Sequence, residues 1–175
     1  GSGDIFLVKY NSSGTKQWTK QLGSSSTDIA TGVTVDSSDN IYVTGWTQGG
    51  LDGNTNAGDA DLFLVKYNSN GVKQWTQQLG TSSWDYGSEV TVDSSDNIYV
   101  TGTTDGGLDG NTNSGGRDNF LVKYNSSGFK QWSTVWGSSG TDYSDDVAVD
   151  SSGNIYTTGH NYKSGYGNEV TLVKH

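Results

Sequence analysis

The sequence contains no cysteine, no proline and no methionine, and its single arginine is Arg117. Without cysteine, no disulfide can stabilise the fold. No apolar run approaches the roughly 20 residues that a membrane-spanning helix needs. One arginine and a net charge of −9 suit phosphate groups poorly, which argues against nucleic acid and anionic membranes as partners.

The 175 residues are enough for one domain of ordinary size. Only 30% are hydrophobic and 17% charged, and Gly, Ser, Thr and Asn make up the difference. Aromatic residues at 11% and regular strand patterns indicate an all-β fold with many turns. Gly1–Gly3 has the composition of a residual tag, so residues 1–3 are interpreted as a tag scar on an excised or engineered chain.

One stretch dominates the sequence: residues 32–45 recur as residues 89–102 and again as 146–159. Each copy reads as a hairpin, with β-forming residues on both sides of a short polar turn. Asp39 and Asp96 occupy the turn position that Gly153 takes in the third copy. Because Asp and Gly both tolerate a left-handed backbone, these acids are expected to be turn residues.

A longer repeat contains this hairpin, with a period of 57 residues. Asp4–Tyr10 returns as Asp61–Tyr67 and as Asp118–Tyr124. The module over 4–175 is therefore divided into repeats 4–60, 61–117 and 118–168 and a partial strand 169–175. Each repeat holds four strand candidates, which are named a (32–36), b (40–47), c (61–67) and d (72–79) after the copy in which they are clearest.

Strand c is apolar on both faces, which predicts a strand covered from two sides. A radial array of small sheets provides that cover, because each sheet lies between its neighbours. Strand d is polar except for its Trp75, as expected of an outermost strand. The period also lies in the range of propellers, so the sequence predicts an all-β β-propeller of four-stranded antiparallel blades, about three per chain.

The chain resembles the bacterial β-propeller repeat often called the SBBP, or seven-bladed β-propeller, repeat. The matching motifs are Val-Asp-x-x-x-Asn-Ile-Tyr-x-Thr-Gly, Asp-x-Phe-Leu-Val-Lys-Tyr and Gly-x-Lys-Gln-Trp, and the resemblance covers essentially the whole chain. It implies the propeller fold and a bacterial secreted or cell-surface parent protein without a defined reaction.

Strands a, b and d are each expected three times and strand c four times, so the chain begins and ends with a c strand. Closed propellers have four to eight blades, and three alone would leave two blade faces uncovered. Either a second chain closes the ring or the chain is part of a longer array. We expect a homo-oligomer, namely a dimer that closes a ring of about six blades.

Two long b–c loops place side-chain oxygens at alternate positions, an arrangement that can wrap calcium and is similar to the calcium loops of integrin-type propellers and EF-hands. The glycine comes one place later than in those loops and no Glu closes the site. The alternative is a run of consecutive turns. The calcium candidates are Asp52, Asn54, Asn56, Asp61, Asp109, Asn111, Asn113 and Asp118.

Aromatic residues that do not follow the repeat gather in or near the long loops. Flat rings beside amides and carboxylates suit sugar rings, whereas the alternative is that they pack the loops. The candidate ligand-binding residues are Trp46, Trp84, Tyr86, Tyr143, Tyr162 and Tyr166.

These features favour a non-enzymatic scaffold or binding module, with a glycan or protein as its ligand. The alternative is a calcium-dependent, lectin-like domain that uses the long-loop face. A glycosidase is a third reading, since propellers can carry paired carboxylates. Asp28, Asp85 and Asp142 recur every 57 residues, so they are expected to form hydrogen bonds with the loop backbone. The cluster of Asp142, Asp145 and Asp146 is interpreted as a solvated acidic edge. His160 and His175 replace residues of other copies and have no triad partners.

Overall fold

A computed structural model describes residues 1, 3–163 and 167–175, and over 162–163 and 167–171 it describes the backbone alone. The described residues form two one-turn 3₁₀ helices, η1 (Leu51–Gly53) and η2 (Leu108–Gly110), and thirteen strands. The strands are β1 Ile5–Tyr10, β2 Lys16–Leu22, β3 Asp28–Val35, β4 Ile41–Thr47, β5 Asp61–Tyr67, β6 Lys73–Leu79, β7 Asp85–Val92, β8 Ile98–Thr104, β9 Asp118–Tyr124, β10 Lys130–Trp136, β11 Tyr143–Val149, β12 Ile155–Lys163 and β13 Gly167–Lys174. None of the helices in the described part of the chain is long and apolar enough to cross a membrane.

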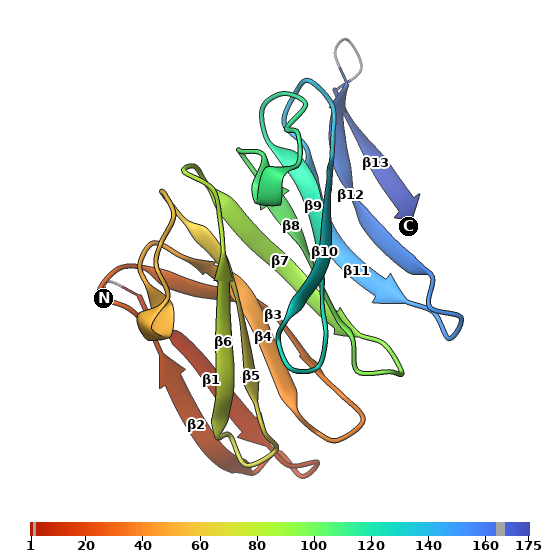
Figure 1. Ribbon diagram of the computed structural model, residues 1–175. Helices are drawn as coiled ribbons and strands as arrows, with labels where there is room; N and C mark the ends of the chain where they lie inside the picture. Colours follow the sequence, from red (N-terminus) through yellow and green to blue (C-terminus); the bar gives the residue numbers. More distant parts are fainter. Residues whose placement is uncertain (2, 164–166) are drawn as a thin grey trace.

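The strands form separate antiparallel sheets that follow one another along the chain (Figure 1). Two sheets are complete, with the orders β3-β4-β5-β6 and β7-β8-β9-β10. An N-terminal pair β1-β2 and a C-terminal triplet β11-β12-β13 flank them. The predicted order a, b, c, d within a blade is confirmed, and so is the fold class. The chain begins with c and d of one blade and ends with a, b and c of another.

Strand a begins earlier than its pattern suggested, at Asp28 instead of residue 32. The reason is a β-bulge: the pairing of β3 with β4 shifts between Ala30 and Gly32. The extra residue, Thr31, turns its hydroxyl to the carbonyl oxygen of Gly87 in the next sheet, 2.8 Å away. A bulge breaks the two-residue alternation of side chains, so the sequence pattern identified only the part of the strand that follows the bulge.

The core lies between the sheets, and strand c contributes to it on both faces. Phe63 and Val65 pack with Ile5 of the preceding sheet. On the other face of the same strand, Leu62 and Leu64 pack with residues of the following sheet, including Val90. This sandwich explains why β5 needs apolar residues at consecutive positions.

The short turns form as their residues predicted. Asp39 and Asp96 have φ of 60°, and Gly153 has φ of 80° at the same place. In the c–d turns the Asn11 side chain accepts hydrogen bonds from the backbone N–H groups of Ser13 and Thr15, at 3.1 and 2.8 Å. These tight turns fix the strand register at one end of every blade.

Candidate functional site

The two kinds of connection lie at opposite ends of the sheets. Short a–b and c–d turns form one face, and the longer b–c and d–a connections form the other, which we call the loop face. Both 3₁₀ helices belong to b–c connections and lie at this face (Figure 1). Variable loops held on rigid sheets are the usual place for binding residues.

The acids that recur in every repeat hold the loops in place. Asp28, Asp85 and Asp142 are almost fully buried, and each accepts a hydrogen bond from the backbone N–H four residues earlier, at 2.5–2.6 Å. At the opposite face, Asp36 accepts bonds from the backbone of Ser38 and Asn40, both at 2.9 Å. These contacts confirm the prediction that the repeated acids form hydrogen bonds with the loop backbone.

The cluster of Asp142, Asp145 and Asp146 is not one acidic edge, contrary to the sequence interpretation. Asp142 is buried in the repeat's loop contact, whereas Asp145 and Asp146 are exposed. Asp145 faces His160, with 3.6 Å between Oδ2 and Nδ1. Asp145 is the extra residue of a β-bulge between Ser144 and Asp146, so the alternation of buried and exposed positions is interrupted here.

The eight calcium candidates make hydrogen bonds to several different groups. Asp52 contacts Lys73 and Thr76 of β6. Asn56 accepts from the backbone of Gly58 at 2.8 Å, and Asp61 from Ala57 at 2.9 Å. The second loop repeats the pattern. Asp109 contacts Ser133 and Lys130, and Asn111 donates to the carbonyl of Leu108. Asn113 accepts a hydrogen bond from the backbone of Gly115, and Asp118 accepts one from the backbone of Ser114. Among the described residues, no group of three or more His, Cys, Asp or Glu side chains could hold a metal ion.

Asp118 and Asp142 share a buried space beside Gly137. A Cβ on that glycine would lie 2.4 Å from Asp118 Oδ1 and 2.5 Å from Asp142 Oδ2. Asp118 Oδ1 has no hydrogen-bond partner among the residues that the structure describes. Burial and the neighbouring Asp142 raise the pKa of Asp118, so protonation of this side chain is favoured. Because both acids are fully buried, no substrate could reach them.

Unrepeated aromatic residues from three sheets meet at the loop face. The Tyr86 ring stacks on Trp84 with 5.5 Å between centroids, and Trp46 meets it edge-on at 5.4 Å. The guanidinium of Arg117 lies 4.9 Å from the Tyr86 ring and 5.5 Å from the Tyr143 ring. Arg117 therefore joins four of the candidate aromatic residues into one cluster.

Asp105 fixes the position of Arg117 in this cluster. Arg117 donates from Nε to Asp105 Oδ1 at 2.7 Å and from Nη2 to Oδ2 at 3.2 Å. This pairing raises the pKa of Arg117, so the guanidinium keeps its charge. The two side chains line an open hollow of about 440 Å³ with Tyr143, Thr141 and the backbone of Gly115 and Gly116.

Arg117 and Asp105 were not predicted from the sequence as parts of this site. Arg117 stands where the preceding repeat has Ala60, and Asp105 where the first has Gln48, so their departure from the repeat was the available signal. His160 also belongs here, because its ring stacks on Tyr143 at 4.8 Å. Two further candidates, the Tyr162 side chain and Tyr166, lie outside the described residues.

Comparison with solved structures supports the propeller-like arrangement. A crystal structure of a protein of unknown function from Bacteroides caccae is similar with a TM-score of 0.51 and 9% sequence identity. The similarity covers 98% of this chain and 57% of that protein, and at this identity it bears on the fold alone.

Comparison of sequences finds a relative and a family. An uncharacterized WD repeat-containing protein, L264, of Acanthamoeba polyphaga mimivirus is 31% identical over 173 residues, which is 83% of this chain and 12% of the viral protein. The beta-propeller repeat model SBBP matches residues 17–52, 74–109 and 131–160, more than half of the chain. Each match begins in strand d and ends in or beyond strand b, so it crosses from one sheet to the next. The chain therefore belongs to the SBBP β-propeller repeat family.

Proposed function

We propose that this chain is a non-enzymatic binding module whose loop face binds a glycan beside Tyr143, Arg117 and Asp105. The observation that carries the proposal is the cluster itself. Residues that depart from the repeat, and so are not needed to build a blade, converge from separate sheets on one open hollow.

The chemistry of the hollow suits a sugar. Tyr143 is 37% exposed, so its side chain can contact a sugar next to the His160 ring and the Arg117 guanidinium that already lie against it. The Arg117–Asp105 pair presents donors and acceptors side by side, as adjacent hydroxyl groups require. Thr141 and the loop backbone add further polar groups. A secreted or cell-surface location, part of the same proposal, would bring the module to such a ligand.

The carboxylates support a role without catalysis. The repeated acids accept hydrogen bonds from their own loops, and Asp85 and Asp118 are fully buried. Asp105, the acid in the hollow, is engaged by Arg117. A glycosidase needs two carboxyl groups facing one accessible substrate bond, whereas the neighbouring acids Asp118 and Asp142 are fully buried.

A glycan array followed by calorimetry on the best ligand tests this proposal. Tyr143→Ala is expected to weaken binding about fivefold, the effect of losing about 1 kcal/mol of ring stacking. Arg117→Ala is expected to weaken it further, because it also leaves Asp105 unpaired. Phe129→Ala is the matched control, since Phe129 is an exposed aromatic residue of a c–d turn at the opposite face. Equal affinity of all variants would contradict the proposal.

Calcium dependence is a separate part of the lectin-like alternative and remains a prediction. A calcium ion would have to replace the contacts that Asp52 makes with Lys73 and Thr76. Calcium titration with thermal melting tests it, because a ligand of the folded state must stabilise that state. A rise in melting temperature reversed by EDTA supports the alternative, and an unchanged melting temperature overturns it.

Self-association into a closed ring is the last part of the proposed function. Its support is that Phe6 and Val33 are 74% and 57% exposed, whereas their counterparts in the other repeats are buried. Light scattering at micromolar concentration tests it. A dimer of the 18.6 kDa chain is expected, and a monomer at all concentrations would contradict it.

A further inference from the structure

We propose that two copies close the ring by strand exchange, in which β1 and β2 of one copy take the place of β13 in the last sheet of the other. This inference rests on the self-association proposed above and states which surfaces meet. Strands β11 and β12 of one copy, with β1 and β2 of its partner, then form one four-stranded blade.

The exposed side of β1 shows what the N-terminal pair lacks. Phe6 is 74% exposed, whereas its counterparts Phe63 and Phe120 are fully buried. Tyr10 is 59% exposed, and its counterparts are 5% and 3% exposed. In the complete sheets a b strand pairs with this edge of strand c. Among the described residues β1 pairs only with β2, so no strand pairs with its edge on that side.

The exposed face of β3 also indicates that a neighbouring blade is missing. Val33 is 57% exposed, while Val90 and Val147 at the same position are 3% and 5% exposed. Strand β7 packs on β3 and β4, and β11 packs on β7 and β8. The cover that β3 lacks is therefore an a strand and a b strand of a preceding blade. These are the strands that complete the β1-β2 pair.

The last sheet of the chain carries a matching position for Phe6. In both complete sheets strand b provides a glycine opposite the phenylalanine of strand c, in the pairs Gly45–Phe63 and Gly102–Phe120. The corresponding glycine of β12 is Gly159, and β13 places Thr171 opposite it. A Cβ added to any of these three glycines would meet the backbone carbonyl at the same position of its own strand a. The backbone here therefore has the same shape in every blade. One end of the chain thus lacks a phenylalanine that the other end exposes.

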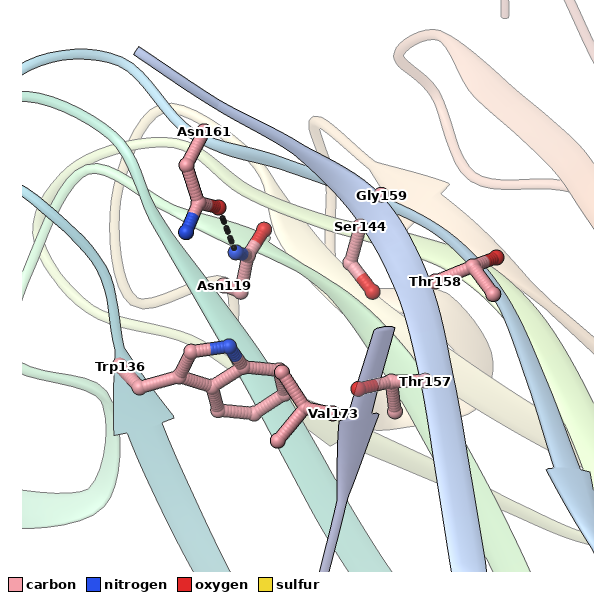
Figure 2. A pocket seen from close by; sticks show the side chains of 8 residues that line it. All are labelled: Asn119, Trp136, Ser144, Thr157, Thr158, Gly159, Asn161 and Val173. Carbon is pink, nitrogen blue, oxygen red and sulfur yellow. Dashed lines mark hydrogen bonds between the residues drawn. The ribbon is translucent and has the colours of Figure 1, made fainter. Parts of the chain in front are cut away.

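A small hollow marks this position (Figure 2). Gly159 and Thr157 of β12 line it on one side, and Asn119 and Trp136 of the preceding sheet line it on the other. In the complete sheet Phe120 lies between Gly102 and the positions of Leu62 and Leu79. Asn119 and Trp136 are the counterparts of those two leucines. The hollow is therefore where the ring of Phe6 would lie, beside an indole and an amide.

Strand β2 would complete the same sheet at its outer edge. Trp75 and Trp132 of strand d contact the tyrosine of strand b, with Trp75 6.1 Å from Tyr42 and Trp132 6.3 Å from Tyr99. Tyr42 and Tyr99 are buried. The last sheet has Tyr156 at this position, only half-buried, and has no d strand among its described residues. Trp18 of β2 would provide the matching indole.

The exchange forms a closed ring and leaves one strand of each copy unused. Each copy contributes two complete sheets, and each of the two shared blades takes two strands from either copy. Two copies related by a two-fold axis then form six blades, within the range of closed propellers. Strand β13 is left over, because it and β1 are both c strands that fit one place.

Engineered disulfides test which c strand occupies that place, and no native cysteine interferes. The register of the complete sheets pairs Thr44 with Leu64, which places Leu7 of one copy opposite Thr158 of the other. Paired strand residues lie within disulfide reach. Under oxidised glutathione the double variant Leu7→Cys/Thr158→Cys is expected to give mainly covalent dimer on a non-reducing gel. The matched control, Thr158→Cys/Leu172→Cys, joins residues that pair within one chain when β13 stays in place. It is expected to lose its intramolecular cross-link as the dimer forms.

A truncation after Lys163 provides a second measurement. Removing β13 removes the competing strand, so the dimer dissociation constant is expected to fall at least fivefold. If the full chain is a monomer, the proposed self-association is wrong, and the exchange with it. If it is a dimer that cross-links through Thr158 and Leu172 but not through Leu7, self-association stands and the exchange is overturned. A truncated chain that folds and stays monomeric also overturns it.

Discussion

Replacing Phe120 with alanine is expected to lower the free energy of unfolding by about 4 kcal/mol, a value typical of buried Phe→Ala changes. Phe120 is fully buried. Its ring lies against Gly102, where an added Cβ would be 2.6 Å from Cζ. The backbone of strand β7 also packs closely on Gly102, since the carbonyl oxygen of Tyr86 would lie 1.9 Å from that Cβ. The neighbouring strand therefore cannot move in to fill the cavity, and the cost of the cavity stays high.

The chain provides its own control for this change. Phe6 occupies the same position of the repeat but is 74% exposed, so Phe6→Ala should cost less than about 0.5 kcal/mol in the monomer. Urea denaturation of both variants, at protein concentrations low enough to keep the chain monomeric, measures the difference. At concentrations where the dimer forms, Phe6→Ala should become costly, because its ring is then buried in the partner. Equal losses for Phe120→Ala and Phe6→Ala in the monomer would refute this account of the core.

Three further changes test other parts of the structure. Asp118→Asn is expected to stabilise the fold by about 1 kcal/mol at pH 7, because an amide can donate toward Asp142 where two carboxylates repel; a destabilised variant in urea denaturation would contradict this. Gly153→Ala is expected to cost about 1 kcal/mol, since φ there is 80°, and an unchanged melting temperature would contradict it. The hydrogen bond from the Asn154 side chain, with others, lowers the pKa of Asp150 to about 2. The stability that Asp150 contributes is therefore present above its unfolded pKa of about 3.9 and is lost as the pH falls toward 2. An Asp150→Ala variant should show a shallower acid transition by circular dichroism.

The strands of each blade could be predicted from the sequence because the residues of a strand reflect which of its faces are buried. Strand c is apolar at consecutive positions, and its two faces do lie in two different core clusters. The turns were recognisable from Asn, Asp and Gly at fixed places. The bulge at Thr31 was not predicted, because an extra residue breaks the two-residue alternation by which a strand is recognised; the same bulge recurs in β7 and β11.

The candidate site was predicted only in part. Its aromatic residues were found because they break the repeat, but Arg117 was read only as evidence against phosphate. Its position between Tyr86 and Tyr143 depends on how two sheets are placed side by side, which no single repeat encodes. For the calcium candidates, the spacing of oxygens along a loop does not determine where the side chains turn. Asp52 turns to β6 because Lys73 and Thr76 lie there.

The blades differ where they face the centre, and those differences fix their order. At one position of strand a the three repeats carry Gly32, Glu89 and Asp146. Glu89 fits because Gly32 has no side chain: a Cβ there would lie 2.6 Å from Glu89 Oε1. Burial and then Asp146 raise the pKa of Glu89, so adjacent acids at this position repel. In the proposed ring Gly32 follows Asp146 of the partner, so each acidic pair is separated from the next by a glycine.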